Sequence, residues 1–286
     1  MIQGSPSWSS DEYFRTESTD VDTTPHCDWI PGGWNNAWHT SNACDAIPGI
    51  ACDGSGNVVS LKITEKGLAG DLPPGLAGRL PKLREVKLDG NLLEGNVLEL
   101  LMYSRTMESF SASRNRLTGR VPCPGAGRVD DEDEAVTRCE SNDGDPDVTY
   151  KGAKGLYHLD LGYNALDGDV PARCLVQCSP GLAVVKLGSN RLTGTVPVAF
   201  ANLRETMRHL DLSSNELRGQ LPVEFGTLDR IKTLDLSLNR IGGQVPGTWM
   251  TDMEALYTLD LAHNRCVYFI PVYVSAIRLT SCFVSG

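Results

Sequence analysis

The chain has 286 residues, of which 41% are hydrophobic and 22% are charged, and its formal net charge is -10. Residues 130–147 hold nine acidic side chains against Arg138, and residues 1–30 hold six against Arg15, so the remainder of the chain carries about +3. No basic stripe that could follow a phosphate backbone is present, nor a run of about 18 apolar residues, which excludes nucleic acid as a partner and a direct membrane span.

The first segment, residues 1–26, is rich in Ser, Thr, Asp and Glu and poor in aliphatic side chains. Such a composition buries too little apolar surface to offset the entropy that is lost on ordering. We therefore expect a flexible acidic arm, or one draped over the rest of the chain. The arm holds no basic stretch followed by an apolar one, so no signal peptide is visible.

The next segment, residues 27–56, contains three tryptophans followed by Cys44 and Cys52. The chain has nine cysteines in local groups, and none of the spacings is the paired CxxC pattern of a zinc site. Cysteines used in this way indicate an oxidising compartment and structural disulfides. We expect an extracellular or cell-surface protein in which Cys44 and Cys52 are bonded and Cys27 is the odd cysteine.

Residues 57–271 repeat one pattern eight times. Two clear copies, MRHLDLSSNELRGQLP from Met207 and IKTLDLSLNRIGGQVP from Ile231, lie 24 residues apart. Apolar side chains occupy positions one, four, six and eleven, Asn position nine, Gly position thirteen and Pro position sixteen. A fixed period of this length is typical of a solenoid. Position nine is Lys66 in the first coil and then Asn91, Asn115, Asn164, Asn190, Asn215, Asn239 and Asn264.

This pattern resembles the plant-type leucine-rich repeat, LxxLxLxxNxLxGxIP, and the cysteine-containing segment before it resembles the amino-terminal cap of such repeats. Plant receptor ectodomains and polygalacturonase-inhibiting proteins are similar in this respect. The resemblance implies an α/β, β-rich solenoid, a right-handed superhelix with a concave parallel sheet of about eight or nine short strands. Residues 27–56 would then cover the end of the solenoid.

The asparagines at position nine are expected to form a ladder. At this position the chain turns off the strand, and a buried amide can satisfy backbone groups that the strand ladder does not reach.

Between the third and fourth coils the step is 49 residues, which indicates an insertion over residues 123–153. Asp143, Asp145 and Asp147 alternate as in a calcium loop, but no Gly follows them and Lys154 stands where the bidentate Glu is required. We interpret the insertion as a solvated acidic loop, and we expect no metal and no cofactor. Three connectivities are open among the cysteines around it, Cys123, Cys139, Cys174 and Cys178.

Residues 272–286 fit a shortened last strand or cap, with Ile277 at position four and Cys282 at position nine. Cys266, at position eleven of the eighth coil, is then expected near Cys282, where a disulfide would clip the end of the chain.

Strand positions two, three, five, seven and eight are expected to face solvent, including Ser109 and Ser111 in the third coil. The resulting face has mixed charge and scattered aromatic side chains, which is typical of recognition surfaces. The candidate partner-binding residues are Arg84, Glu85, Lys87, Tyr157, His158, Asp160, Tyr163, Lys186, Arg208, His209, Asp211, Tyr257 and Asp260.

The function that this pattern favours is a non-catalytic extracellular module that binds a protein or peptide partner through the concave strand face. No Ser-His-Asp signature, nucleophile elbow or phosphate loop is present, so we expect no enzyme. Asp211, Asp235 and Asp260 share position five, but LDL is the ordinary strand sequence of the repeat. His158 and His209 share position three two coils apart, roughly 10 Å by strand spacing, which is too far for one metal.

Two alternatives stay open. The chain could be a structural or accessory subunit of a larger assembly that uses its ends, arm and insertion for contacts; Cys27, the acidic insertion and the absence of Asn-x-Ser/Thr favour this. Adsorption to ice is disfavoured, because Thr64, Thr118 and Thr193 do not recur at one strand position.

Overall fold

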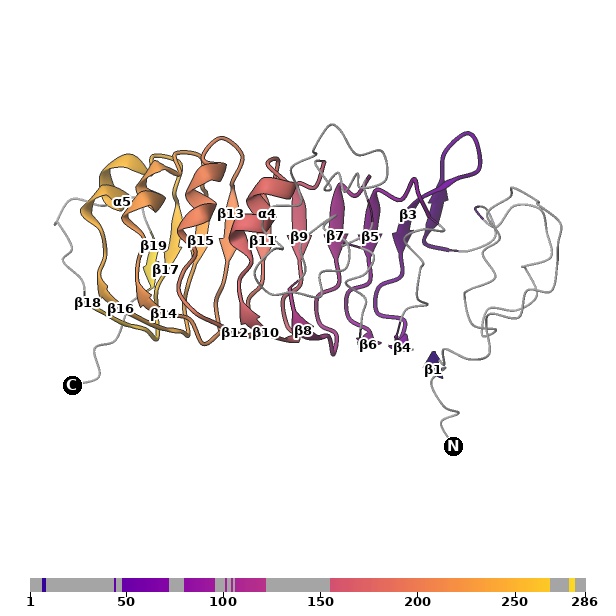
Figure 1. The fold of residues 1–286 in the computed structure, drawn as a ribbon, viewed down its shortest axis with the longest axis horizontal. Coiled ribbons are helices and arrows are strands. Elements are labelled where there is room, and N and C mark those ends of the chain that lie inside the picture. The colour runs from indigo at the N-terminus through magenta and orange to yellow at the C-terminus, as the bar shows by residue number, and fades with distance from the viewer. Residues whose placement is uncertain are drawn as a thin grey trace, which may run out of the picture.

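The computed structural model describes residues 48–71, 80–95, 106–121 and 155–267, together with residues 7–8, 44, 101, 104 and 278–280. The described residues form an elongated row of coils that stack along one axis (Figure 1). Each complete coil presents a strand of one long sheet, then a short strand on a second side, and in the later coils a short helix on a third side. The arm over residues 1–26 and the insertion over residues 123–153 lie almost entirely outside the described residues.

Among the described residues the long sheet has ten strands, in the order β19-β17-β15-β13-β11-β9-β7-β5-β3-β2. All neighbours pair in parallel except β2, which is antiparallel to β3. The predicted β-rich solenoid with eight or nine parallel strands is therefore confirmed. The strands are β2 Ile50–Cys52, β3 Val58–Lys62, β5 Glu85–Lys87, β7 Ser109–Ser111, β9 His158–Asp160, β11 Val184–Lys186, β13 His209–Asp211, β15 Thr233–Asp235, β17 Thr258–Asp260 and β19 Arg278–Thr280.

The apolar positions of the repeat build one continuous core behind this sheet. Leu210 at position four lies opposite Leu234 on the next strand, and both are buried, as is Leu236 at position six. Successive side chains of a strand point to opposite faces, so positions three and five face outward. Each fully buried Leu contributes about 1.5 to 3 kcal/mol by removing apolar surface from water. The period of the sequence therefore fixes both the core and the outer face.

On the second side the chain forms shorter strands that pair in parallel, seen along the lower edge of Figure 1. They make three sheets, β1-β4-β6, β8-β10-β12 and β14-β16-β18. Their bounds are β1 Ser7–Trp8, β4 Ala69–Gly70, β6 Leu92–Leu93, β8 Thr118–Arg120, β10 Ala165–Asp169, β12 Arg191–Thr193, β14 Arg218–Gln220, β16 Arg240–Gln244 and β18 Arg265–Val267.

Strand β1 belongs to the arm that we expected to be flexible or draped over the rest of the chain. It pairs with β4, with Ser7 opposite Ala69. An edge strand presents unpaired backbone groups, and β1 satisfies some of those on β4. Composition did not reveal this pairing, because backbone hydrogen bonds do not require apolar side chains.

The third side carries α4 Ala172–Cys178, the 3-10 helices η2 Val198–Leu203 and η3 Val223–Thr227, and α5 Gly247–Asp252. Each follows the Pro at position sixteen, whose fixed φ suits the residue before a helix. Beneath them, the Phe225 and Trp249 rings stack with centroids 5.8 Å apart, and Trp249 Nε1 donates to the Pro222 carbonyl at 3.0 Å. The helices therefore close the core opposite the strands.

Two positions of the first seven coils adopt left-handed backbone. Position eight does so without regard to residue type, as Tyr163 and Leu238 show with φ of 56° and 54°. Position thirteen is Gly in these seven coils, whereas in the eighth coil it is Tyr268, which lies outside the described residues. At Gly194, φ is +81° and a Cβ would lie 2.6 Å from Asp169 Oδ1, so a side chain would be both strained and obstructed. The Gly of the motif is therefore required by the backbone.

A disulfide joins Cys44 to Cys52, with Cα atoms 5.7 Å apart. Cys174 and Cys178 are also disulfide-bonded, yet their sulfurs lie 3.9 Å apart, so they are not bonded to each other. This excludes one of the three connectivities left open by the sequence. Cys27, Cys123, Cys139 and Cys282 lie outside the described residues, and the structure does not describe the side chain of Cys266.

The last strand is shifted from the register that the sequence pattern suggested. In β19, Leu279 lies opposite Leu259 at position four, where we had placed Ile277. A shift of two residues keeps the same alternation of faces, so the apolar pattern does not distinguish the two registers.

Candidate functional site: the concave face

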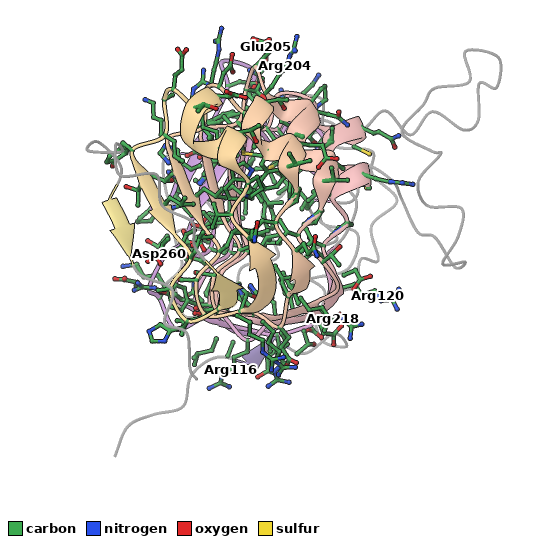
Figure 2. All side chains as sticks on the ribbon, turned by 90° about the vertical axis from the view of Figure 1, so that its left-hand side faces the viewer. Arg116, Arg120, Arg204, Glu205, Arg218 and Asp260 are labelled. Atoms are coloured by element: carbon green, nitrogen blue, oxygen red, sulfur yellow. A yellow bond between two sulfur atoms is a disulfide. The ribbon has the colours of Figure 1, made fainter. Side chains whose placement is uncertain are left out.

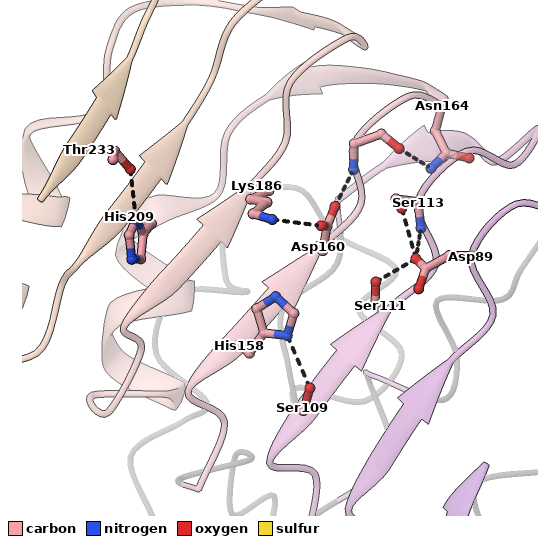
Figure 3. Close-up of polar contacts among 11 residues, drawn as sticks. Asp89, Ser109, Ser111, Ser113, His158, Asp160, Asn164, Lys186, His209 and Thr233 are labelled. Atoms are coloured by element: carbon pink, nitrogen blue, oxygen red, sulfur yellow. Dashed lines mark hydrogen bonds and ion pairs between the residues drawn. The ribbon is translucent and has the colours of Figure 1, made fainter. Parts of the chain in front are cut away.

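We call the outward side of the long sheet the concave face. It carries every candidate partner-binding residue, and all of them are exposed or half-buried. Because the strands pair in register, equal positions form rows across the sheet: His158, Val184 and His209 at position three, and Asp211, Asp235 and Asp260 at position five. Figure 3 shows the polar contacts in the middle of this face.

At the amino-terminal end, Glu85 is held between two lysines. Its carboxylate lies 2.8 Å from Lys62 Nζ and 3.2 Å from Lys87 Nζ, and it accepts a hydrogen bond from Ser60 Oγ at 3.2 Å. Burial alone would raise the pKa of Glu85, but the hydrogen bonds and charges of the two lysines outweigh it and lower the pKa. Lys62 was not among the candidate residues, although its place at position five of the first coil could have identified it.

The next cluster centres on Asp89. Its Oδ1 accepts hydrogen bonds from Ser111 Oγ at 2.5 Å and from the backbone N–H and the Oγ of Ser113, both at 2.8 Å (Figure 3). Ser109 and Ser111 are only 3% and 4% exposed, so the prediction that they face solvent was wrong. Both are too short to rise above their larger neighbours. Ser111 donates to Asp89, and Ser109 shares a hydrogen bond with His158.

His158 stands at the centre of the face. Its Nδ1 is 3.1 Å from Ser109 Oγ, across an interval of 49 residues, and its ring stacks on Tyr157 with centroids 6.5 Å apart. Beside it, Asp160 lies 3.5 Å from Lys186 Nζ. Burial lowers the pKa of His158, and the charge of Lys186 adds to this while that of Asp160 opposes it. Burial therefore favours the neutral form of the ring.

His209 has a separate environment. Its Nδ1 is 2.7 Å from Thr233 Oγ1, and burial, with Lys232 and Lys186 nearby, lowers its pKa. Strand β11 separates it from His158, so the structure does not bring the two histidines together. Within the part of the chain that the structure describes, no group of three His, Cys, Asp or Glu side chains could hold a metal ion.

Towards the carboxyl-terminal end three carboxylates form a row across the face. Asp211 and Asp235 accept hydrogen bonds from Ser213 and Ser237, at 2.6 and 2.7 Å from the serine Oγ atoms. Asp260 accepts one from the Ala262 N–H at 2.9 Å. Burial raises the pKa of Asp235, and the charges of Asp211 and Asp260 on both sides add to the effect. Over the described ranges, these three carboxylates form no ion pair.

Exposed aromatic side chains stand at the borders of the face. Tyr157, Tyr163 and Tyr257 are 51%, 59% and 59% exposed. The Arg114 guanidinium lies 5.4 Å from the centre of the Tyr163 ring, which is a cation–π contact. Leu238, 51% exposed at position eight, is a further border residue that was not among our candidates.

The asparagines of position nine hold neighbouring coils together. Asn215 Nδ2 donates to the Leu212 carbonyl of its own coil and to the Leu187 carbonyl of the preceding one, at 3.2 and 3.0 Å, while its Oδ1 accepts from the Leu192 N–H at 2.9 Å. The same arrangement recurs at Asn91, Asn115, Asn164, Asn190, Asn239 and Asn264.

Comparison with known proteins agrees with this geometry. Residues 180–241 match the leucine rich repeat family. The receptor-like kinase TMK2 of Arabidopsis thaliana is 27% identical over 137 residues, which are 46% of this chain and 12% of that protein. The chain carries plant-type leucine-rich repeats. No helix among its described residues is long and apolar enough to cross a membrane.

Solved structures extend the match to most of the repeat array. The leucine-rich-repeat ectodomain of the plant membrane receptor kinase GASSHO1/SCHENGEN3 from Arabidopsis thaliana, in complex with CASPARIAN STRIP INTEGRITY FACTOR 2, is 26% identical with a TM-score of 0.62. The match covers 77% of this chain but only 23% of the ectodomain chain. A plant ice-binding protein is 25% identical with a TM-score of 0.65. That match covers 82% of this chain and 66% of the ice-binding protein's chain.

Proposed function

We propose that this protein is a non-catalytic extracellular recognition module that binds a protein or peptide through the concave face. The observation that carries the proposal is the exposure of Tyr157, Tyr163 and Tyr257 around a half-buried polar sheet. A Tyr side chain offers a large apolar ring and a hydroxyl with few rotatable bonds, which suits an interface anchor. The similar GASSHO1/SCHENGEN3 ectodomain is itself described in complex with another factor.

The spacing of the tyrosines supports an extended segment as the part of the partner that is bound. Tyr157 precedes β9 and Tyr257 precedes β17, four strand steps along the sheet. At about 4.8 Å a step this is roughly 19 Å, the length of about six extended residues. Such a segment would cross His158 and His209 and reach the carboxylates at position five.

The charges of the face support a partner of mixed sign. Glu85 and Asp160 already have lysine partners, whereas Asp211, Asp235 and Asp260 lack ion pairs among the described residues. Donors of a partner, from its backbone or its basic side chains, would find free acceptor positions on these carboxylates. We expect them to contribute to specificity more than to affinity, because half-exposed charges are screened.

Adsorption to ice is not the function that we propose, although one similar structure is an ice-binding protein. The threonines that could have formed an ice-binding row do not lie opposite one another on neighbouring strands. Thr118 lies opposite Ala165, and Thr193 lies opposite Asp169. The strands around them carry exposed charged side chains instead of a repeated threonine row.

Capture of partners from an extracellular extract tests the proposal. The intact protein is compared with a variant in which Tyr157, His158, Arg208 and His209 are replaced by Ala, and with a control in which Arg173, Asn202, Arg204 and Glu224 of the helical side are replaced by Ala. A partner retained by the intact protein and the control but lost by the concave variant supports the proposal. A partner that the concave variant retains, or one lost equally by both variants, contradicts it.

A further inference from the structure

The second side of the solenoid carries an unbalanced set of arginines near the carboxyl-terminal end. Arg218 in β14, Arg240 in β16 and Arg265 in β18 lie on three neighbouring strands, and all three are exposed. We call them the arginine strip. Figure 2 shows Arg218 at one edge of the coil together with Arg116 and Arg120, away from Asp260 of the concave sheet and from Arg204 and Glu205. The strip is therefore a different surface from the concave face.

Carboxylates accompany the arginines of earlier coils on this side. Arg116 pairs with Glu94 at 3.2 Å, and Arg191 of β12 lies opposite Asp167 in the strand register, although the two form no ion pair within the described ranges. In the strip, Arg240 pairs with Glu216 at 3.1 Å. Arg218 and Arg265 form no ion pair within the described ranges. Two of the three guanidinium groups are thus left to solvent, on a chain whose net charge is -10.

The strand register places two arginines side by side in the strip, and only Arg240 has a carboxylate partner, Glu216, within the described ranges. Arg218 lies directly opposite Arg240, and Arg265 lies opposite Gly242. Like charges directly opposite one another in a sheet are destabilising. Local conflicts of this kind are expected where a surface serves a function. An anionic partner would relieve the repulsion and would bind to donors that are already exposed.

We propose that the arginine strip binds an acidic protein segment. The guanidinium of Arg matches a carboxylate with two parallel hydrogen bonds. Spacing within the strip is uneven, because Arg240 is one strand step from Arg218, whereas Arg265 is one step further and displaced by two residues along the strand. Asp and Glu side chains of differing reach can follow this stagger, while a polyuronate with a rigid even repeat cannot.

Two glutamines favour a polypeptide for a second reason. Gln220 ends β14 and Gln244 ends β16, and both are exposed beside the arginines. A Gln amide both donates and accepts hydrogen bonds, so it can pair with the N–H and C=O of a peptide backbone. This site is additional to the proposed concave-face site and does not depend on it.

The test is a binding titration of the full chain with a fluorescently labelled polyglutamate peptide of about 15 residues. The strip variant combines Arg218→Gln, Arg240→Gln and Arg265→Gln, and the control combines Arg173→Gln, Arg204→Gln and Arg230→Gln, which removes the same charge from the helical side. We expect the unmodified chain to bind the peptide in a salt-sensitive manner. The affinity should fall about tenfold or more in the strip variant, which loses three surface ion pairs with the peptide, and less than threefold in the control.

Three outcomes would overturn the proposal: no binding by the unmodified chain, equal weakening in both variants, or tighter binding of polygalacturonate than of polyglutamate at equal carboxylate concentration. Melting temperatures monitor folding independently. That of the strip variant should stay close to that of the unmodified chain, because the substitutions remove both the repulsion between Arg218 and Arg240 and the exposed ion pair between Arg240 and Glu216.

Discussion

A single Asn in seven of the eight coils joins strand, turn and neighbouring coil, and Asn215 shows how. It is nearly buried, and its amide reaches backbone groups of two coils at once. Those groups lie where the chain leaves the sheet and have no strand partner. The sequence predicted this role because Asn recurs at the one position where such groups need an amide.

Replacing Asn215 with Leu should therefore destabilise the protein by about 1 to 3 kcal/mol, because buried backbone donors and acceptors lose their partners. The free energy of unfolding can be measured by chemical denaturation, with the exposed Asn202→Leu as a control that should change little. An unchanged melting temperature for the Asn215 variant would refute the ladder argument.

Gly194 gives a second prediction at this scale. An Ala there must hold a left-handed backbone and place its Cβ against Asp169, so Gly194→Ala should lower stability by about 1 to 2 kcal/mol. Gly247, at the start of α5, has no positive φ, and a Cβ added to it would meet no atom within 4 Å. Gly247→Ala should be neutral or slightly stabilising, and equal thermal shifts for the two variants would argue against the backbone explanation.

The pH dependence of stability tests the environment of His158. Its pKa in the folded protein lies below the ordinary value of 6.5, chiefly because of burial. The unfolded chain then binds the proton more readily, so this contribution to stability is complete above pH 6.5 and is lost as the pH falls below it. Between pH 7.5 and 5.5, the unmodified protein should lose stability more steeply than His158→Gln. Parallel curves would show that burial does not lower the pKa of His158.

At the scale of elements, the period of the sequence predicted the nine parallel strands of the long sheet and their faces, but neither β2 nor the short strands of the second side. It could not predict which outward side chains are covered, because that depends on neighbours in other coils. Ser109 is buried by a contact with His158 that spans the insertion, and Ser111 by its bond to Asp89. The register of β19 was also beyond the pattern, since a two-residue shift preserves the alternation of faces.

The amino-terminal disulfide makes an element-scale prediction. Cys44 and Cys52 tie residue 44 to β2, whose other support is its pairing with β3. Reduction should loosen this end first, because end coils have a neighbour on one side only. Hydrogen exchange after reduction should show faster exchange in β2 and β3 while β13 and β15 stay protected. Earlier opening of the middle coils would contradict this order.

For the whole molecule, the solenoid separates its surfaces by side. The concave face has exposed tyrosines and half-buried polar groups. The second side, with the short strands, has the arginine strip, and the third side, with the helices, closes the core. The repeat pattern predicted the concave face as a surface, since it gives the residues at each position. The arginine strip was not predicted. Its arginines form one surface only through the pairing register of β14, β16 and β18, which the sequence pattern alone does not give.

Site-specific photo-crosslinking tests the central claim, that the partner occupies the concave face, most directly. A photoreactive phenylalanine analogue is placed at Tyr163 on that face and, separately, at the exposed Val198 of η2 on the helical side. After irradiation in an extracellular extract, we predict that the protein labelled at position 163 crosslinks to a partner and that the protein labelled at position 198 does not. Crosslinks from position 198 alone, or equally from both positions, would contradict the account.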